Sequence, residues 1–195
     1  ESGADITLMY HSVDSAKEEF LSCYTLDINK QKGVDAITPN RGNAKNKNIF
    51  MDTYVMKKEL FLDLVTKAHK MSAMYSLVDI IDEQCHELDV RAVPHRGYFA
   101  SVTDFKSYYD ANMSLIDLKN AMNLFANDWP VYTRTNDSCP TQYFDSSSVK
   151  SSVVSNGCLI EGTIENSVIG RGCIIKEGAI VKNCVISSDV VIGKG

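Results

Sequence analysis

The chain has 195 residues, of which 44% are hydrophobic and 23% charged, and its formal net charge is −5. This composition supplies enough apolar material for a packed core. The acidic balance excludes the positive surface of a nucleic-acid-binding protein, and no run reaches the roughly 18 apolar residues of a membrane span. The six cysteines form no CxxC pair, so we interpret them as small buried hydrophobic residues in a reducing, cytoplasmic compartment.

The first 127 residues alternate strand and helix patterns. Strands are predicted at 5–10, 24–28, 34–37, 49–56, 88–93 and 98–102, with a short helical patch at 15–21. Helices are predicted at 57–70, around 77–85, and from a cap at Thr103-Asp104 to about 125. Alternation of this kind is typical of an α/β layer structure.

Each predicted helix has an apolar stripe that should face the core. For the first two helices the stripes comprise Leu60, Phe61, Leu64, Val65 and Ala68, then Leu77, Val78, Ile81 and Cys85. For the third helix the stripe comprises Tyr108, Ala111, Leu115, Leu118, Met122 and Phe125. We therefore expect Tyr108 to pack in the core rather than to stack on a ligand.

Residues 128–147 are predicted to form an extended linker, since Pro130 and Pro140 disfavour helix at the residues before them. Residues 148–195 contain an internal repeat whose copies start at Val149, Ile164 and Val181, 15 and 17 residues apart. A solvent-facing antiparallel meander would also show alternating apolar residues. The matching register of three copies instead favours stacked repeats.

The repeat has a six-residue period, which is the pattern of a hexapeptide β-helix with triangular coils. About three left-handed coils are expected. The residues predicted to point inside are Val154, Ile160, Ile169, Ile175, Ile186 and Ile192. The sequence opens almost directly on a strand and stops within a repeat, so we expect an excised piece of a longer protein with an incomplete β-helix.

Taken in order, the strings IFMDTYVM–KKELF, YFASVTDFKSYYDANMSL and NDWPVYTRTNDSCPTQYF, followed by hexapeptide repeats, resemble the bacterial glucose-1-phosphate adenylyltransferases (ADP-glucose pyrophosphorylases). The resemblance covers the chain from about Asp5 and is strongest to the D-type subunit of glycogen biosynthesis. It implies the C-terminal half of a Rossmann-like nucleotidyltransferase domain followed by the β-helix. The glycine-rich phosphate loop of that family does not occur in this sequence.

The same resemblance implies a degenerate substrate pocket at Thr38, Tyr54 and Ser101. Thr38 stands where the family has a sugar-phosphate-binding lysine, and Ile37 stands where it has a glutamate. Tyr54 matches the sugar-facing tyrosine. Ser101 replaces the metal-binding aspartate, and a hydroxyl is a poor substitute for a carboxylate at Mg²⁺. We expect no catalytic residue, no metal and no cofactor in this chain, although active family members use Mg²⁺ and ATP.

Two functions follow from the resemblance. The first is a regulatory or structural subunit that partners a catalytic glucose-1-phosphate adenylyltransferase subunit, and a homo- or hetero-oligomer such as a tetramer is expected. The second is an active sugar-1-phosphate nucleotidyltransferase with an altered pocket. Substitution at both Thr38 and Ser101 favours the first. A sugar phosphate is a candidate ligand, whereas nucleic acid and membranes are not expected partners.

The four histidines, His11, His69, His86 and His95, lie outside the repeats. β-Helix carbonic anhydrases bind metal through repeat-borne histidines, and hexapeptide acyltransferases commonly use a histidine base. Neither activity is therefore expected here. His69 is interpreted as a cation at a helix C-terminus.

Overall fold

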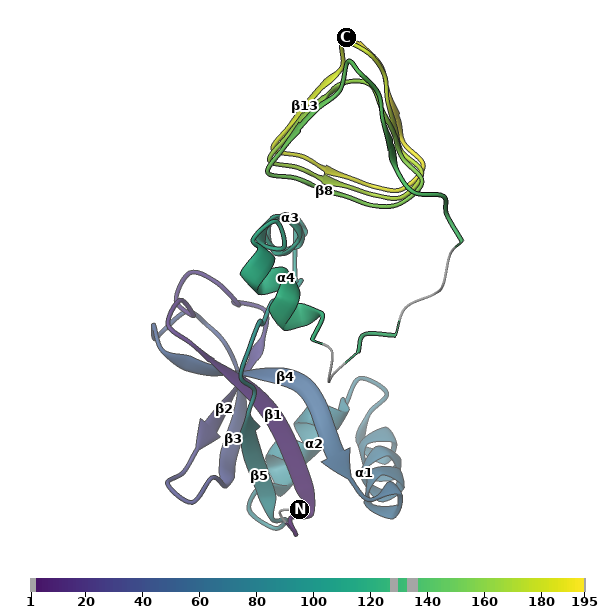
Figure 1. Cartoon of the computed structure of the whole chain (residues 1–195). Coiled ribbons are helices and arrows are strands. Elements are labelled where there is room, and N and C mark those ends of the chain that lie inside the picture. The colour runs from purple at the N-terminus through teal and green to yellow at the C-terminus, as the bar shows by residue number, and fades with distance from the viewer. Residues whose placement is uncertain (1–2, 127–129, 133–136, 195) are drawn as a thin grey trace. The chain divides into compact units, whose positions relative to one another are not determined.

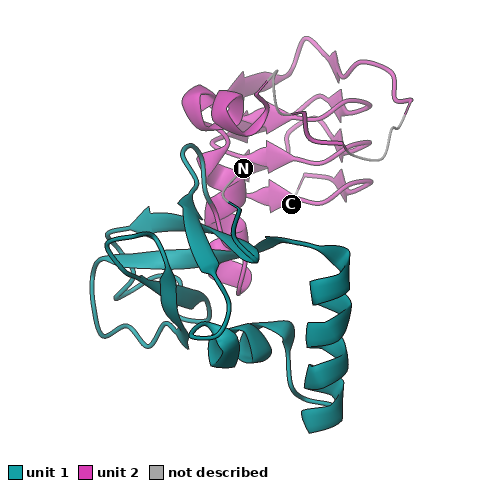
Figure 2. Ribbon diagram, turned by 90° about the horizontal axis from the view of Figure 1, so that it is seen from below, with its two compact units in different colours: residues 1–99 teal, residues 100–195 magenta. Residues whose placement is uncertain are grey.

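The computed structural model describes residues 3–126, 130–132 and 137–194. It divides into two compact units, residues 1–99 and 100–195 (Figure 2). No helix among the described residues has the length and apolar character required to cross a membrane. The boundaries inferred from the sequence, at 127/128 and 147/148, stay a prediction.

The first unit contains a five-stranded mixed sheet in the order β3-β2-β4-β1-β5 (Figure 1). Its strands are β1 (Ile6–Val13), β2 (Tyr24–Ile28), β3 (Val34–Pro39), β4 (Lys47–Met56) and β5 (Val90–Pro94). The pairs are antiparallel except β1 with β5, which is parallel. The chain passes from β4 to β5, on the other side of β1, through α1 (Lys58–Met71) and α2 (Leu77–Gln84).

One hydrophobic core joins this sheet to the two helices. Ile6 and Leu8 of β1 are fully buried together with Leu64 of α1 and Ile81 of α2. The α2 stripe is confirmed, since Val78, Ile81 and Cys85 are buried and Leu77 packs against the core. The α1 stripe is confirmed only in part, because Phe61 and Val65 remain 42% and 41% exposed.

A bulge interrupts the pairing of β1 with β4. Leu8 pairs with Tyr54 and Tyr10 with Phe50, so residues 50–54 of β4 lie opposite only residues 8–10 of β1. Asp52, inside the bulge, has a φ of 51°. A bulge of this kind bends a strand and redirects its side chains.

The sheet curls so that its two edge strands approach each other. Gly33, just before β3, forms an antiparallel bridge with Arg91 of β5. The backbone N–H of Ala92 donates to the carbonyl of Lys32 at 2.9 Å. The N–H of Ile37 on β3 donates to Oδ1 of Asp82 on α2 at 2.6 Å.

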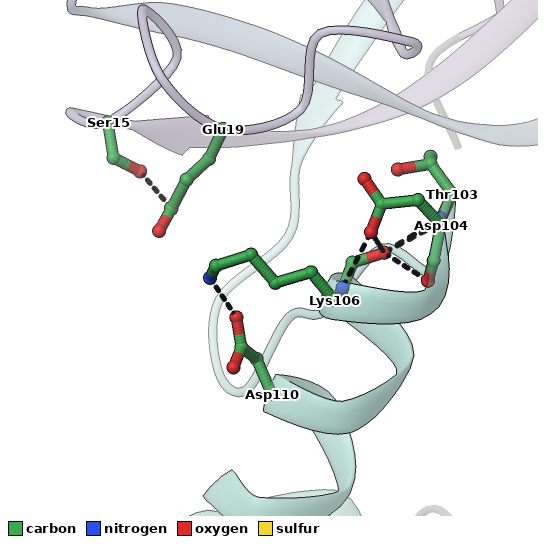
Figure 3. A network of polar contacts seen from close by, with 7 residues as sticks. Ser15, Glu19, Thr103, Asp104, Lys106 and Asp110 are labelled. Atoms are coloured by element: carbon green, nitrogen blue, oxygen red, sulfur yellow. Dashed lines mark hydrogen bonds and ion pairs between the residues drawn. The ribbon is translucent and has the colours of Figure 1, made fainter.

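The segment predicted as a helical patch at 15–21 forms turns instead. The buried side chain of Asn40 donates to the carbonyl oxygens of Ala16, Glu19 and Phe20, at 2.9, 3.3 and 2.9 Å. The Ser15 hydroxyl donates to Glu19 at 2.6 Å (Figure 3). The segment makes an i→i+4 bond from the N–H of Glu19 to the carbonyl of Ser15 at 3.0 Å, but a side chain satisfies carbonyls that a continuing helix would pair with its own N–H groups.

The second unit begins with α3 (Phe105–Ser114) and α4 (Leu118–Leu124), where the sequence predicted one long helix. Asp104 caps α3 through a hydrogen bond from the N–H of Ser107 at 2.7 Å, and Lys106 pairs with Asp110 on the same helix (Figure 3). Asp117 accepts from the N–H of Lys119 at 2.7 Å. This second cap starts a new helix and explains the break.

The predicted burial along these two helices is wrong, because neither contains a buried residue. Tyr108, Leu118, Met122 and Phe125 are 42%, 71%, 65% and 60% exposed. The adjacent Tyr109 makes the contact with the β-helix, donating from its hydroxyl to the carbonyl of Asn183 at 2.9 Å. The strand predicted at 98–102 is also absent, since those residues pair with no other strand.

The β-helix contains three parallel sheets, which appear in Figure 1 as the sides of a triangle. One joins β7 (Ser148–Lys150), β10 (Thr163–Glu165) and β13 (Ile180–Lys182). A second joins β8 (Val153–Val154), β11 (Val168–Ile169) and β14 (Val185–Ile186). The third joins β6 (Gln142–Tyr143), β9 (Leu159–Ile160), β12 (Ile174–Ile175) and β15 (Val191–Ile192).

The register of these sheets confirms the repeat alignment and the three-coil prediction. Val154, Ile169 and Ile186 pair in one sheet, and Ile160, Ile175 and Ile192 pair in another. The middle members of both sets are fully buried, and the terminal ones pack against the same core. Inward-facing thiols also contribute: Cys158 and Cys173 donate to the carbonyls of Gly170 and Ser187, each at 3.1 Å.

The expectation of buried cysteines holds for Cys85, Cys158 and Cys173. Cys23 and Cys184 are partly exposed, and Cys139 is exposed. None of the six, which all lie in the part of the chain that the structure describes, forms a disulfide bond.

Candidate functional site

Thr38, the first residue of the predicted pocket, lies on β3 and bonds to its neighbour on β2. The hydroxyl oxygens of Thr25 and Thr38 are 3.2 Å apart, and the Thr25 hydroxyl also lies 3.1 Å from the Thr38 carbonyl. Thr25 is 1% exposed, whereas Thr38 is partly exposed, so the contact between them is partly buried. A neutral hydroxyl in this setting offers no positive charge to a phosphate group.

Ile37, next to Thr38, belongs to the core and is 3% exposed. Its backbone N–H is occupied by the carboxylate of Asp82. A negative charge therefore lies beside the strand position where the resemblance implies phosphate binding. Such a charge repels an anionic ligand unless a cation offsets it.

Tyr54 lies on β4 just past the bulge, where its ring packs edge-on against Phe50 at a centroid distance of 5.2 Å. Its hydroxyl donates to Oδ1 of Asp52 at 2.6 Å. Burial and then this carboxylate raise the pKa of Tyr54 well above its usual value. The bulge thus turns two neighbouring residues of one strand into a hydrogen-bonded pair.

Thr38 and Tyr54 share one sheet but are not neighbours in it. Thr38 pairs with Thr25, which in turn pairs with Ile49 of β4. Tyr54 lies five residues further along β4 and pairs with Leu8. The sheet therefore does not align these two members of the predicted pocket.

Ser101 belongs to the second unit, in the extended segment that precedes the Asp104 cap, and is partly exposed. Among the described residues, no group of three or more His, Cys, Asp or Glu side chains could hold a metal ion. The predicted pocket, Thr38, Tyr54 and Ser101, stays a prediction.

A cluster that the sequence analysis did not find lies at the ends of β1 and β5. His11 Nδ1 and His95 Nδ1 are 3.3 Å apart. The His11 ring stacks on Phe99 at a centroid distance of 4.8 Å, and Phe99 stacks on Phe20 at 5.6 Å. Burial, followed by the charge of His95, lowers the pKa of His11. The sequence gives little indication of this contact. The two histidines are 84 positions apart, and the parallel pairing of β1 with β5 brings them together.

His69 lies in the last turn of α1 with Lys70, which confirms its predicted position at a helix C-terminus. It is exposed, as is His86. His95 immediately follows β5.

The β-helix matches a family model described as GlmU-like, C-terminal hexapeptide, over residues 140–195. The chain is 36% identical over 131 residues to the glycogen biosynthesis protein GlgD of Geobacillus stearothermophilus, which covers 67% of this chain and 38% of that protein. It is 41% identical over 105 residues to the glucose-1-phosphate adenylyltransferase of Fervidobacterium nodosum, covering 54% and 25%.

A further relative is GlgD of Bacillus subtilis, at 30% identity over 132 residues, covering 68% of this chain and 38% of that protein. The chain thus spans about a quarter to two fifths of the length of these relatives. The resemblance found in the sequence is confirmed. The chain is therefore related to the GlgD glycogen biosynthesis proteins and the glucose-1-phosphate adenylyltransferases, and it carries a hexapeptide β-helix behind an α/β region.

Proposed function

We propose that the protein carrying this chain is a non-catalytic subunit of a glucose-1-phosphate adenylyltransferase assembly and acts in glycogen biosynthesis. The observation that carries the proposal is the chemistry at the pocket positions. A threonine hydroxyl already bonded to Thr25, and not a lysine, occupies position 38. The similarity to two GlgD proteins over about two thirds of the chain supports the same assignment.

The charges around these positions also favour a non-catalytic role. In-line nucleotidyl transfer needs cations to position and neutralise the attacking phosphate. Asp82 instead places a carboxylate at the N–H of Ile37, and Asp52 places another at the hydroxyl of Tyr54. Both carboxylates oppose the binding of an anionic sugar phosphate.

Ser101 adds an argument about the metal. A catalytic Mg²⁺ relies on carboxylate oxygens to hold it against water. The resemblance places such a carboxylate at position 101, where this chain has a hydroxyl. Losing one charged group that acts on a transition state costs about 10²–10³ in rate, and losses at two such positions need not add.

A regulatory subunit would act through its interface with a catalytic partner. In this proposal it forms a hetero-oligomer, and the differential stability of two assembly states conveys the effector signal. The alternative, an active transferase with an altered sugar pocket, draws on the 41% identity to an adenylyltransferase.

The test is a pyrophosphate-release assay on the natural protein that contains this chain, purified alone and then mixed with its catalytic partner. We expect turnover at least about 10²-fold below that of the partner, and a change in the partner's kinetics on mixing. Turnover alone near the roughly 10 s⁻¹ of an ordinary enzyme would establish the active alternative.

Two double variants test whether the substrate pocket is still folded but lacks its charged groups, or no longer exists. Ser101→Asp combined with Thr38→Lys restores the charges that the family pattern implies. Thr38→Val with Ser101→Ala makes changes at the same positions without restoring charge. Partial activity in the first pair only would show that the pocket persists around its missing charges.

A further inference from the structure

His11 and His95 are brought together by the register of a parallel strand pair. Tyr10 of β1 pairs with Pro94 of β5, so the residues that follow them, His11 and His95, lie side by side. The N–H of His95 donates to the carbonyl of Tyr10 at 2.7 Å, which fixes the backbone at this point. The side chains of residues 11 and 95 therefore start from adjacent, hydrogen-bonded backbone positions.

The two imidazoles approach each other through their Nδ1 atoms. These atoms are 3.3 Å apart, whereas the ring centroids are 5.5 Å apart and the planes are inclined at 49°. In the metal-free chain this distance fits a hydrogen bond in which one ring donates and the other accepts. Two imidazole nitrogens on one tetrahedral ion, each about 2.0–2.1 Å from it, lie about 3.3 Å apart.

We propose that His11 and His95 form a two-histidine binding site for a late first-row divalent metal ion, of which Zn²⁺ and Ni²⁺ are the probes. Nδ1 of each ring is the ligand atom, and water completes the coordination. Among the described residues no third His, Cys, Asp or Glu side chain joins the pair to form a larger group. The site is therefore open, and an open two-ligand site binds more weakly than a closed structural one.

The surroundings of His11 favour a fixed ligand. Its ring stacks on Phe99 with an interplanar angle of 22°, and Phe99 stacks on Phe20 with an angle of 25°. A ring held by packing loses less rotational freedom when it binds, so less binding free energy is spent on ordering it. His69 and His86 are exposed.

The ligand type also selects the metal. Imidazole nitrogen suits Zn²⁺, Cu²⁺ and Ni²⁺, whereas Mg²⁺ and Ca²⁺ require oxygen ligands. This site is therefore distinct from any Mg²⁺ chemistry of nucleotidyl transfer, and its existence does not depend on the function proposed above.

The test is calorimetric titration of the folded chain with Zn²⁺ and with Ni²⁺, together with nitrogen NMR of the histidine rings. We expect one histidine-bound ion per chain above the binding by thiols, and a shift of both Nδ1 resonances, with the Nε2 atoms keeping their protons. His11→Phe, which keeps an aromatic ring on Phe99, should weaken binding at least about tenfold, as should His95→Gln.

The matched control is the double variant His69→Ala/His86→Ala, which removes two exposed histidines and should leave the affinity unchanged. The free thiols are identical in every variant, so their binding contributes an equal background. Weaker binding in this control, equal binding in His11→Phe, or no perturbation of Nδ1 would overturn the proposal. If a variant fails to fold, the ring spectrum of the unmodified chain decides the matter.

Discussion

The β-helix and the five-stranded sheet build their cores in different ways. In the β-helix a buried side chain stacks on its counterpart one coil away, as Ile175 does on Ile160 and Ile192. In the sheet, Ile6 and Leu8 share a core with side chains from two helices and all four other strands. The stability of a repeat protein is close to a sum of contributions from single coils and from contacts between neighbouring coils. The stability of the mixed sheet depends instead on contacts between residues far apart in sequence.

The largest effect is expected from Ile175→Ala in the middle coil. Ile175 is fully buried, and removing a buried isoleucine side chain to the β-carbon costs about 2–5 kcal/mol. Urea denaturation followed by amide hydrogen exchange in residues 140–194 measures the loss. Ile192→Ala, in the same stack but in a terminal and partly exposed coil, should cost clearly less. Equal losses of unfolding free energy in the two variants would contradict a difference in stability between the middle and the terminal coil.

Asn40→Ala tests the long-range dependence of the sheet unit. The change removes the side-chain donor of three carbonyls of the 15–21 segment. The Phe20 carbonyl keeps the N–H of Cys23 at 3.1 Å, so the loss falls on Ala16 and Glu19, and each buried unsatisfied group costs about 1–3 kcal/mol. The free energy of unfolding and exchange in the 15–23 amides report it. Asn43→Ala, at an exposed asparagine of the same loop, should be close to neutral. A neutral Asn40→Ala would mean that water replaces the side chain.

Gly162→Ala tests how closely the coils approach each other. A β-carbon at residue 162 would lie 2.6 Å from the Ala179 carbonyl oxygen in the next coil. Overpacking of this kind costs about 1–3 kcal/mol. At Gly193 no atom lies within 4 Å of an added β-carbon, so Gly193→Ala serves as the control. Equal thermal stability of the two variants would contradict the close stacking.

The smallest effect is expected at the start of α2. The Ser76 hydroxyl accepts from the N–H of Asp79, and the Asp79 carboxylate accepts from the backbone N–H of Ser76, which completes a capping box. Ser76→Ala should cost about 1 kcal/mol, whereas Ser76→Thr should retain most of the cap.

The cap should also depend on pH. Hydrogen bonds from the hydroxyl and then the N–H of Ser76 lower the pKa of Asp79. The folded-state pKa therefore lies below the unfolded value of about 3.9. The contribution is fully present above that value and is lost as the pH falls through the folded pKa. In acid titrations of stability, Asp79→Asn should flatten this part of the curve; an unchanged curve would count against it.

The sequence predicted the regular parts of the molecule and missed those set by tertiary contacts. The period that aligns Ile160, Ile175 and Ile192 is local and repeated, so it specified the coils directly. The break after Ser114 depends on a competing cap at Asp117, and apolar periodicity does not detect a cap of that kind. The 15–21 turns depend on Asn40, some twenty residues away.

The candidate site likewise has features that the sequence predicts and features that it does not. The substitutions proposed at Thr38 and Ser101 come from the sequence, because they concern residue identity. The pairing of Tyr54 with Asp52 follows from a bulge, and the contact of His11 with His95 follows from strand register. The spacing of residues in the sequence predicts neither contact, because both form only when β1 pairs with β4 and β5.

The approach of β3 to β5 has a consequence for the behaviour of the folded chain at high concentration. Exposed strand edges with unpaired N–H and C=O groups are templates for aggregation. Here the bridge between Gly33 and Arg91 occupies part of both edges, and the Asp82 carboxylate occupies the N–H of Ile37. A foreign strand that docked on β3 would have to displace a charged acceptor from a helix. The curl of the sheet should therefore disfavour amyloid-type growth at these edges. The contacts that block the edges are the same contacts that stabilise the fold.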